Sequence, residues 1–308
     1  MDGIYFPGMG IGFSNVPSGF TIFGYEIKFY GLIITVGFLL ALMIACRDAK
    51  KSGQNPDDYI DYLLVMIVPV ILGARIYYVL FNLKEYVTPG KSLGQTLLDM
   101  INIRNGGLAI YGGLIAGVLV AVIYTKKKKI YLPLFADTIA MGVFVGQILG
   151  RWGNFFNREA FGAYTKAFYR MAIPVSYYEQ HGYYQYLVNS GIISEKMIQN
   201  PEVVNGMACI TVTPTFLFEG LWNLMLLIFI FCYRKKKKFD GELALFYVAG
   251  YGIGRFLVEA LRTDSLMIGP FKISQLVGLA CFIVAFAALL YNYISIKKGK
   301  EPKCNRVA

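Results

Sequence analysis

The sequence predicts an all-α polytopic membrane protein with about seven transmembrane helices. Of its 308 residues, 56% are apolar and only 16% are charged, with a mean hydropathy of +0.51. Soluble domains usually have about 25% charged residues. A bilayer core needs ~20 apolar residues per helix, and such stretches occur at seven places: 26–46, 59–82, 106–125, 132–156, 214–233, 241–262 and 271–294.

Residues 1–25 are expected to form an extracytoplasmic N-terminal arm on the protein surface. The first residues have no basic segment and are interrupted by Gly and Pro, so they do not resemble a secretory signal. The run FTIFGYEIKF (20–29) alternates in polarity around Gly24-Tyr25, which is typical of a short hairpin. This hairpin would lead into transmembrane helices 1–4, within residues 26–156.

The distribution of Lys and Arg predicts the orientation, because basic residues collect in cytoplasmic loops. With the N-terminus outside and the C-terminus cytoplasmic, the inner pieces hold 17 of the 30 basic residues: 47–58, 126–131, 234–240 and the basic tail 295–308. Residues 157–213 then form a small extracytoplasmic head, and helices 5–7 lie in 214–294. Nucleic-acid binding is disfavoured, because each basic run directly follows an apolar segment.

Charged residues inside the apolar segments are candidates for a site. An arginine at bilayer depth costs ~2.5–3.5 kcal/mol even on the lenient insertion scale. Four arginines and four acids occur there: Arg75, Arg151, Arg255, Arg262, Asp61, Asp137, Glu219 and Glu259. Glu259 is spaced to share a helix face with Arg255 and Arg262. Two interpretations stay open, a structural salt-bridge cluster and arginines held in place for a ligand phosphate.

Neither a metal site nor a cofactor is expected. The five cysteines show no CxxC spacing, so they are interpreted as small apolar residues or incidental thiols. The single histidine, His181, lies in a polar stretch without a catalytic or zinc motif around it. It is expected to be a surface or locally bonded residue.

Six motifs occur in order along nearly the whole chain. Five of them are KFYGLIITVGF (28–38), GARIYYVLFN (73–82), YGGLIAG (111–117), PTFLFEGLWN (214–223) and YGIGRFLVEALRTD (251–264). The sixth and most specific is GRWGNFFNREAFG (150–162). Together they resemble the motifs of the prolipoprotein diacylglyceryl transferase family, whose signature Gly-Arg-x-Gly-Asn-Phe-x-Asn-x-Glu-x-x-Gly is similar to the sixth.

The resemblance implies a reaction and its partners. In a bacterial plasma membrane, the diacylglyceryl group of phosphatidylglycerol would pass to the thiol of the lipobox cysteine in a preprolipoprotein signal peptide. A thioether forms and glycerol 1-phosphate leaves. A thiolate is the nucleophile, and arginines would stabilise the departing phosphate.

By residue, the resemblance implies a catalytic set of Tyr111, Arg151, Asn154, Glu159 and Arg255. Arg151 and Arg255 would bind the phosphate, while Asn154 and Glu159 orient the headgroup or the arginine. The substrate-binding set comprises Arg151 again together with Tyr30, Gly112, Asn157, Gly162, Tyr251, Glu219, Glu259 and Arg262.

The chain departs from the family at Tyr111, where much of the family has histidine. A tyrosine with a pKa near ~10 is a poor general base. Tyr111 is therefore expected either to position the substrate by hydrogen bonding or to pack, with the proton acceptor elsewhere. A lipid transporter or scramblase is the competing function; no paired broken-helix repeat supports it. An intramembrane protease would need a nucleophile–histidine pair or a zinc motif, and neither occurs.

Overall fold

The structure is a computed structural model that describes residues 2–87, 90–103 and 106–305. Residue 1 of the predicted arm and residues 306–308 of the predicted tail lie outside the described residues. Within the described part, seven helices are long and apolar enough to cross a membrane: α1 (Phe29–Lys51), α2 (Asp57–Phe81), α5 (Ile110–Lys128), α6 (Leu132–Asn157), α10 (Thr215–Tyr233), α11 (Glu242–Leu261) and α12 (Ile273–Lys297). They match the seven predicted segments, and the chain is a mostly helical, multi-pass membrane protein.

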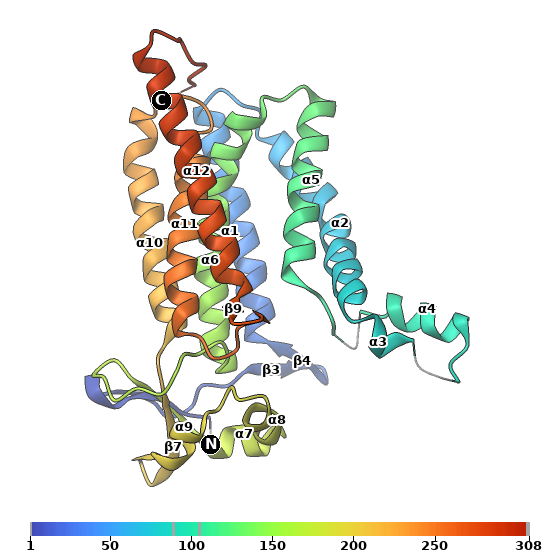
Figure 1. The fold of residues 1–308 in the computed structure, drawn as a ribbon, viewed down its shortest axis with the longest axis vertical. Coiled ribbons are helices and arrows are strands. Elements are labelled where there is room, and N and C mark those ends of the chain that lie inside the picture. The colour runs from blue at the N-terminus through green and yellow to red at the C-terminus, as the bar shows by residue number, and fades with distance from the viewer. Residues whose placement is uncertain (1, 88–89, 104–105, 306–308) are drawn as a thin grey trace.

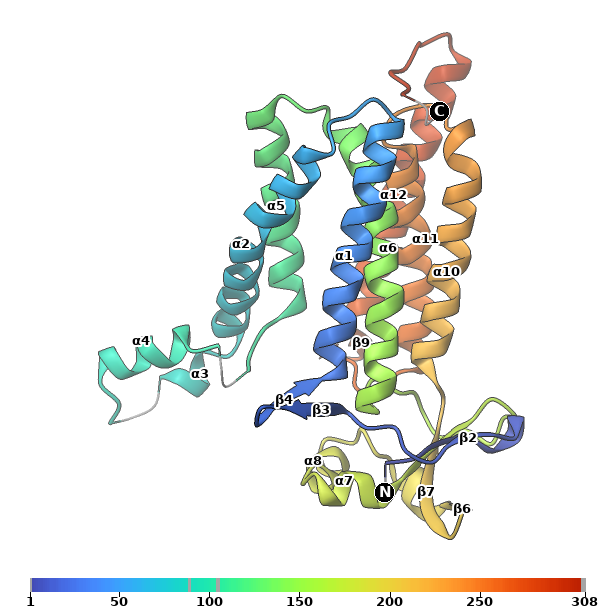
Figure 2. The same ribbon diagram turned by 180° about the vertical axis from the view of Figure 1, so that it is seen from behind.

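Five of these helices form one bundle, and the other two form a hairpin beside it. Helix α6 packs against α1 and α10, and α11 packs against α12, whereas α2 packs mainly against α5 (Figures 1 and 2). The pair of helices α2 and α5 joins the bundle at the end where the C-terminal residues of the chain lie, called here the C-terminal end of the bundle. The contact is an aromatic cluster in which the rings of Tyr59 and Phe135 stack with their centroids 4.8 Å apart. Large apolar side chains remain exposed along the outer faces, for example Leu39 and Val284, as expected where lipid surrounds the helices.

At the opposite end of the bundle lies a small folded head. Its sheet has the strand order β2-β1-β5-β7-β6, built from β2 (Ile11–Phe13), β1 (Ile4–Phe6), β5 (Met171–Pro174), β7 (Met207–Val212) and β6 (Glu202–Val204). Three short helices complete it: α7 (Val175–Gln180), α8 (Tyr184–Asn189) and α9 (Glu195–Gln199). His181 ends α7, with its Nδ1 2.8 Å from the Tyr177 carbonyl oxygen, so the prediction of a locally bonded histidine is confirmed.

The start of the chain is paired into the head sheet and does not lie free as a separate arm. Strand β1 pairs with both β2 and β5, and its three side chains are buried in the head. Arg158, at the end of α6, fixes this segment by donating hydrogen bonds to the carbonyls of Asp2 at 2.5 Å and Val16 at 2.6 Å. The N-terminal segment and the head are therefore one folded unit. The sequence did not indicate this, because the alternating pattern that marks a strand is too short to detect in a Gly- and Pro-rich stretch.

The hairpin predicted before the first membrane helix is confirmed. Strands β3 (Gly19–Ile22) and β4 (Tyr25–Lys28) pair antiparallel, and Phe23 and Gly24 between them have φ values of 50° and 81°. Two left-handed residues in succession are typical of a tight hairpin turn. Two short helices, α3 (Leu83–Tyr86) and α4 (Leu93–Ile101), follow α2. The remaining short elements are η1 (Pro7–Met9), η2 (Arg234–Lys236), β8 (Met267–Ile268) and β9 (Phe271–Lys272).

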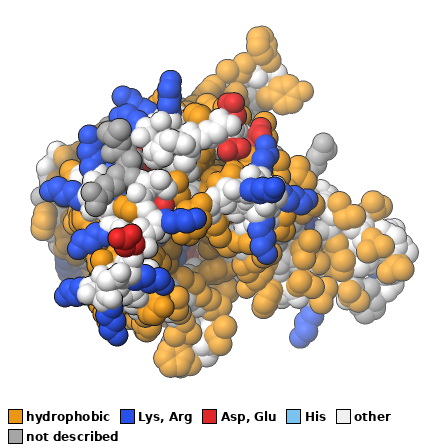
Figure 3. Space-filling model, turned by 90° about the horizontal axis from the view of Figure 1, so that it is seen from above, with side chains coloured by type: hydrophobic (Ala, Val, Ile, Leu, Met, Phe, Trp, Pro, Cys, Tyr) orange, Lys and Arg blue, Asp and Glu red, His pale blue; other side chains and the backbone are white. Residues whose placement is uncertain are grey.

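The C-terminal end of the bundle collects the basic runs, and Lys and Arg side chains lie around it in Figure 3. Beneath them, Asp137 is 2% exposed and accepts hydrogen bonds from Lys237 Nζ and from the backbone amides of Gly241 and Ala244, each at 2.9 Å. The prediction of a buried charge is confirmed for Asp137. It is wrong for Asp61, whose side chain is 49% exposed and pairs with Lys128 at 2.9 Å, because it lies at the open end of the helical hairpin.

Candidate active site

Two buried glutamates and three arginines form a continuous network near the head, where α6 and α11 end and α10 begins. Glu219 on α10 is 1% exposed, and its two carboxylate oxygens bind different arginines. Arg151 Nη2 on α6 lies 2.6 Å from Glu219 Oε1, and Arg255 Nη1 on α11 lies 3.0 Å from Glu219 Oε2. One carboxylate on one helix thus fixes guanidinium groups from two others.

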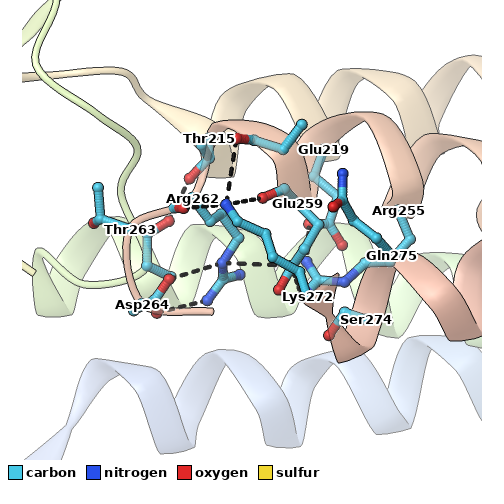
Figure 4. Close-up of polar contacts among 12 residues, drawn as sticks. Thr215, Glu219, Arg255, Glu259, Arg262, Thr263, Asp264, Lys272, Ser274 and Gln275 are labelled. Carbon is cyan, nitrogen blue, oxygen red and sulfur yellow. Dashed lines mark hydrogen bonds and ion pairs between the residues drawn. The ribbon is translucent and has the colours of Figure 1, made fainter. Parts of the chain in front are cut away.

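The network continues along α11 through Glu259. Its carboxylate pairs with Arg255 one helical turn earlier and lies 3.9 Å from Arg262 Nε. Arg262 itself follows the last residue of α11, so it lies just beyond the membrane helix, although the predicted segment 241–262 included it. There it forms a two-pronged pair with Asp264, at 2.9 and 2.7 Å (Figure 4). The predicted helix-face spacing is confirmed for Arg255 and Glu259, whereas Arg262 approaches Glu259 from beyond the end of the helix.

Lys272 and Ser274 join this region from the start of α12, and the sequence did not single them out. The Lys272 ammonium donates to three carbonyls at and just beyond the end of α11, those of Glu259 at 2.8 Å, Ala260 at 3.3 Å and Arg262 at 2.7 Å (Figure 4). The last carbonyls of a helix lack the intrahelical amide partners of earlier turns, so the ammonium stabilises the end of α11. A lysine directly before an apolar segment is ordinary in a membrane protein, so no sequence signal distinguished this one.

Asn154, Asn157 and Glu159 lie at the end of α6, on the side of Arg151 that faces the head. Arg151 Nη1 donates to Asn154 Oδ1 at 3.3 Å, and both asparagine amides donate to Glu159 Oε1, at 2.9 and 3.2 Å. Glu159 is exposed, unlike Glu219 and Glu259. The predicted residues therefore form a graded site, with buried ion pairs inside and an exposed polar edge outside.

The two predicted tyrosines flank Arg151. Tyr251 lies close enough to Arg151 for a direct electrostatic interaction, and its ring stacks on that of Tyr247, with the ring centroids 5.9 Å apart. Tyr30 on α1 packs against Gly153 of α6, where an added Cβ would approach the ring to within 2.6 Å. Both rings thus lie against the segment that holds Arg151.

The predicted glycines bring backbone segments together. Gly112 is buried, and a side chain there would collide with the backbone of Gly73 on α2. At Gly162 an added Cβ would lie 2.6 Å from the Leu261 carbonyl oxygen. Gly162 donates its N–H to the Thr213 carbonyl at 2.8 Å, so the chain after α6 runs between the start of α10 and the end of α11. Close backbone packing accounts for the absence of a side chain at both positions.

Tyr111 is linked to this region through Ser274. Its hydroxyl lies 2.8 Å from Ser274 Oγ, which joins the start of α5 to the start of α12. Ser274 is two residues after Lys272, the residue that binds the end of α11. The tyrosine at the position of the family histidine therefore has a specific hydrogen-bonding partner.

All five cysteines are free. Cys209 is buried in the head sheet, and burial raises the pKa of its thiol to about 11, which disfavours the reactive thiolate. Among the described residues no group of three or more His, Cys, Asp or Glu side chains could hold a metal ion.

This arrangement can bind an anion. A guanidinium has five N–H donors, and Arg255 uses two of its nitrogens on glutamates within the described part of the chain. The side chains of Arg151, Arg255 and Arg262 remain 18, 15 and 12% exposed. Each is thus held by a buried carboxylate while part of its donor surface stays accessible, as recognition of a phosphate requires.

Comparison with known proteins identifies the family. The family model described as prolipoprotein diacylglyceryl transferase matches residues 17–291. A phosphatidylglycerol–prolipoprotein diacylglyceryl transferase of Clostridioides difficile is 37% identical over 272 residues, covering 88% of this chain and 93% of that protein. Proteins of the same name from Clostridium perfringens (numbered 1 there) and Clostridium kluyveri are 35 and 37% identical, covering 93 and 89% of this chain and 97 and 96% of their own lengths. This chain belongs to the prolipoprotein diacylglyceryl transferase family.

Proposed function

We propose that this protein transfers the diacylglyceryl group of phosphatidylglycerol to the lipobox cysteine of preprolipoproteins, the first step of bacterial lipoprotein maturation. Membership of the family over residues 17–291 carries this proposal. The arginine–glutamate network supports it, because the reaction develops negative charge on a departing phosphate inside a membrane protein.

The proposed chemistry is a displacement at carbon. The cysteine loses its proton, and the thiolate attacks the diacylglyceryl carbon that carries the phosphate ester. A C–S bond forms while the C–O bond to phosphate breaks, and glycerol 1-phosphate leaves with the electron pair. Arg151 and Arg255 bind the phosphate as this charge develops, in a site where low water content strengthens the contact.

Other residues support these two. Asn154, Asn157 and Glu159, at the exposed edge, orient the headgroup hydroxyls of the lipid. Glu219 and Glu259 hold the arginines, and Arg262 extends the positive region toward the head. The further contacts proposed for the lipid come from Tyr30 and Tyr251, while Gly112 and Gly162 permit the close packing that shapes the site.

The proposed orientation follows the basic residues. The C-terminal end of the bundle is cytoplasmic, and the head, formed by residues 157–213 with the N-terminal strands, lies outside the bacterial plasma membrane. This places the arginine network near the outer surface, where a secreted preprolipoprotein presents its cysteine.

The direct test is an assay with purified protein, phosphatidylglycerol vesicles and a lipobox peptide. We expect release of glycerol 1-phosphate and a mass increase of the peptide by one diacylglyceryl group. The same peptide with Ser for Cys should give neither product. Movement of labelled phosphatidylglycerol between leaflets, without glycerol phosphate release, would instead indicate a scramblase.

The protein's own cysteines are expected to be dispensable. Replacing Cys46, Cys209, Cys232, Cys281 and Cys304 with Ala or Ser should leave transfer largely intact, because the reacting thiol belongs to the peptide. The measurement is the initial rate of the cysteine-free protein at matched membrane abundance. Loss of activity on removing one particular cysteine, with unchanged expression, would indicate a covalent enzyme intermediate.

Tyr111 is expected to act by positioning. Tyr111→Phe and Ser274→Ala each remove one partner of the same hydrogen bond, so each should lower the transfer rate by about 2–10-fold, as expected for ~0.5–1.5 kcal/mol. The double variant should be little worse than either single variant. Tyr111→His should be tolerated. A fully active Phe variant with an inactive His variant would make residue 111 a packing element, and the proton acceptor would be sought first at Glu159.

A further inference from the structure

A second polar layer lies one helical turn from the Arg151–Glu219 pair, toward the middle of the bundle. Gln147 precedes Arg151 by four residues on α6, and Asn223 follows Glu219 by four on α10. Residues four apart lie on the same helix face. Since α6 and α10 run antiparallel (Figure 2) and Arg151 contacts Glu219, the same register places Gln147 opposite Asn223.

Contacts on either side support this register. One further turn inward, Phe144 and Leu227 belong to the same hydrophobic cluster, as the antiparallel spacing requires. Helix α11 contributes to the layer as well, because Gln147 Nε2 donates to the Tyr247 hydroxyl at 2.9 Å. Tyr247 in turn precedes Tyr251, which lies near Arg151, by one turn.

Much of the hydrogen-bonding capacity in this layer has no partner within the part of the chain that the structure describes. Asn223 is 0% exposed, yet neither its Oδ1 nor its Nδ2 has a hydrogen-bonding partner among the described residues. The same holds for Gln147 Oε1. Two acceptors and one donor group are thus buried at a depth where lipid offers no replacement bonds.

We propose that Gln147, Asn223 and Tyr247 form an internal hydration site that supports the arginine layer from within the bundle. Water fits this set of groups, because it can donate to the two amide oxygens and accept from the Asn223 amide. Buried waters typically make about three such bonds to groups that are otherwise unsatisfied. A lipid ester carbonyl could satisfy only the donor.

The site would act on the reaction through Arg151. Water bound between Gln147 and Asn223 fixes the Gln147 amide, which donates to Tyr247. The Tyr247 ring stacks on Tyr251 with an interplanar angle of 9°, and Tyr251 lies within direct electrostatic range of Arg151. Gln147 and Asn223 are positioning residues in this arrangement, since the hydrogen bonds and ion pairs of Arg151 and Arg255 among the described residues go to other side chains.

Asn223→Leu tests the proposal, because leucine has the branched shape and the number of side-chain heavy atoms of asparagine but no polar atoms. If Asn223 is hydrated, this change removes satisfied bonds and strands Gln147 Oε1, so the unfolding midpoint of the purified protein should fall by about 2–4 °C. An Asn223 amide without any partner would give the opposite result, since its replacement by an apolar group is then stabilising. An unchanged or raised midpoint overturns the proposal, whether or not the protein proves to be a transferase.

Two further variants complete the design. Asn223→Ser replaces the amide with a hydroxyl, which can still bind water. This variant should therefore be closer to wild type than the leucine variant in both unfolding midpoint and turnover. Asn292→Leu is the matched control, because Asn292 on α12 already donates to the Ala288 carbonyl at 2.8 Å. In transfer assays, Asn223→Leu should lower kcat several-fold with little change in the KM for phosphatidylglycerol. This second expectation rests on the proposed function.

A high-resolution structure of the protein in lipid gives the direct observation. Density for water within hydrogen-bonding distance of both Gln147 Oε1 and the Asn223 amide is expected. A direct hydrogen bond between the Gln147 and Asn223 amides, with no water density beside either of them, would overturn the proposed hydration site even if the transfer assay succeeds.

Discussion

Arg151→Lys should lose most transfer activity while retaining the fold. Lysine keeps the positive charge but cannot bind Glu219, Asn154 and a phosphate at once with a planar fork. Removing a single preorganised donor from a transition-state site typically costs about 10²–10³-fold in rate, so a loss of that size is expected. The measurement is the rate of glycerol 1-phosphate release at saturating lipid and peptide, with protein levels matched.

Arg170→Lys provides the control for this change. Arg170 in the head also forms a two-pronged pair, with Glu202 at 2.6 and 2.7 Å, but it lies outside the network. The same chemical substitution there should leave the rate within about twofold, since partly exposed ion pairs contribute little. Near-full activity of a well-expressed Arg151→Ala protein would remove Arg151 from the proposed phosphate site.

The membrane helices could be predicted from sequence because each depends on local composition alone. A run of ~20 apolar residues has few alternatives to a spanning helix. The hairpin before α1 was also predictable, since its turn and alternating strands lie within ten residues. The head sheet was not, because β1 and β5 are more than 160 residues apart in the chain and their pairing has no local signature.

In the predicted site, too, features that depend on nearby residues could be predicted, whereas contacts between distant segments could not. Glu259 and Arg262 could be joined to Arg255 by helix spacing, and motif resemblance selected Arg151 and Glu219. The contacts of Lys272 and Ser274 depend on how α12 meets α11 and α5, which spacing along one segment cannot give. The prediction that Asp61 is buried was wrong for a related reason: a position near a helix end is buried or exposed according to which other segments pack against it.

Glu219→Gln is expected to be the most destabilising single change in the site. Glu219 compensates two arginines at 2.6 and 3.0 Å while its own side chain is 2% exposed. Glutamine has the same shape but no charge, so Arg151 loses its carboxylate partner and Arg255 keeps only Glu259. Breaking a buried ion pair by removing one partner typically costs ~3–5 kcal/mol, and the unfolding midpoint of the purified protein should fall accordingly.

The matched control is Glu202→Gln in the head. Glu202 also binds an arginine, and side-chain hydrogen bonds from Arg170 lower the pKa of its carboxyl group. Its side chain is 30% exposed, however, so solvent can replace the lost partner and the change should cost less than ~1 kcal/mol. Glu219→Asp, which keeps the charge on a shorter side chain, should fall between wild type and Glu219→Gln. If Glu219→Gln proves as stable as Glu202→Gln, the Glu219 carboxylate is not what holds Arg151 and Arg255 at membrane depth. The proposed support for the phosphate site would then have to come from the Asn154–Glu159 edge instead.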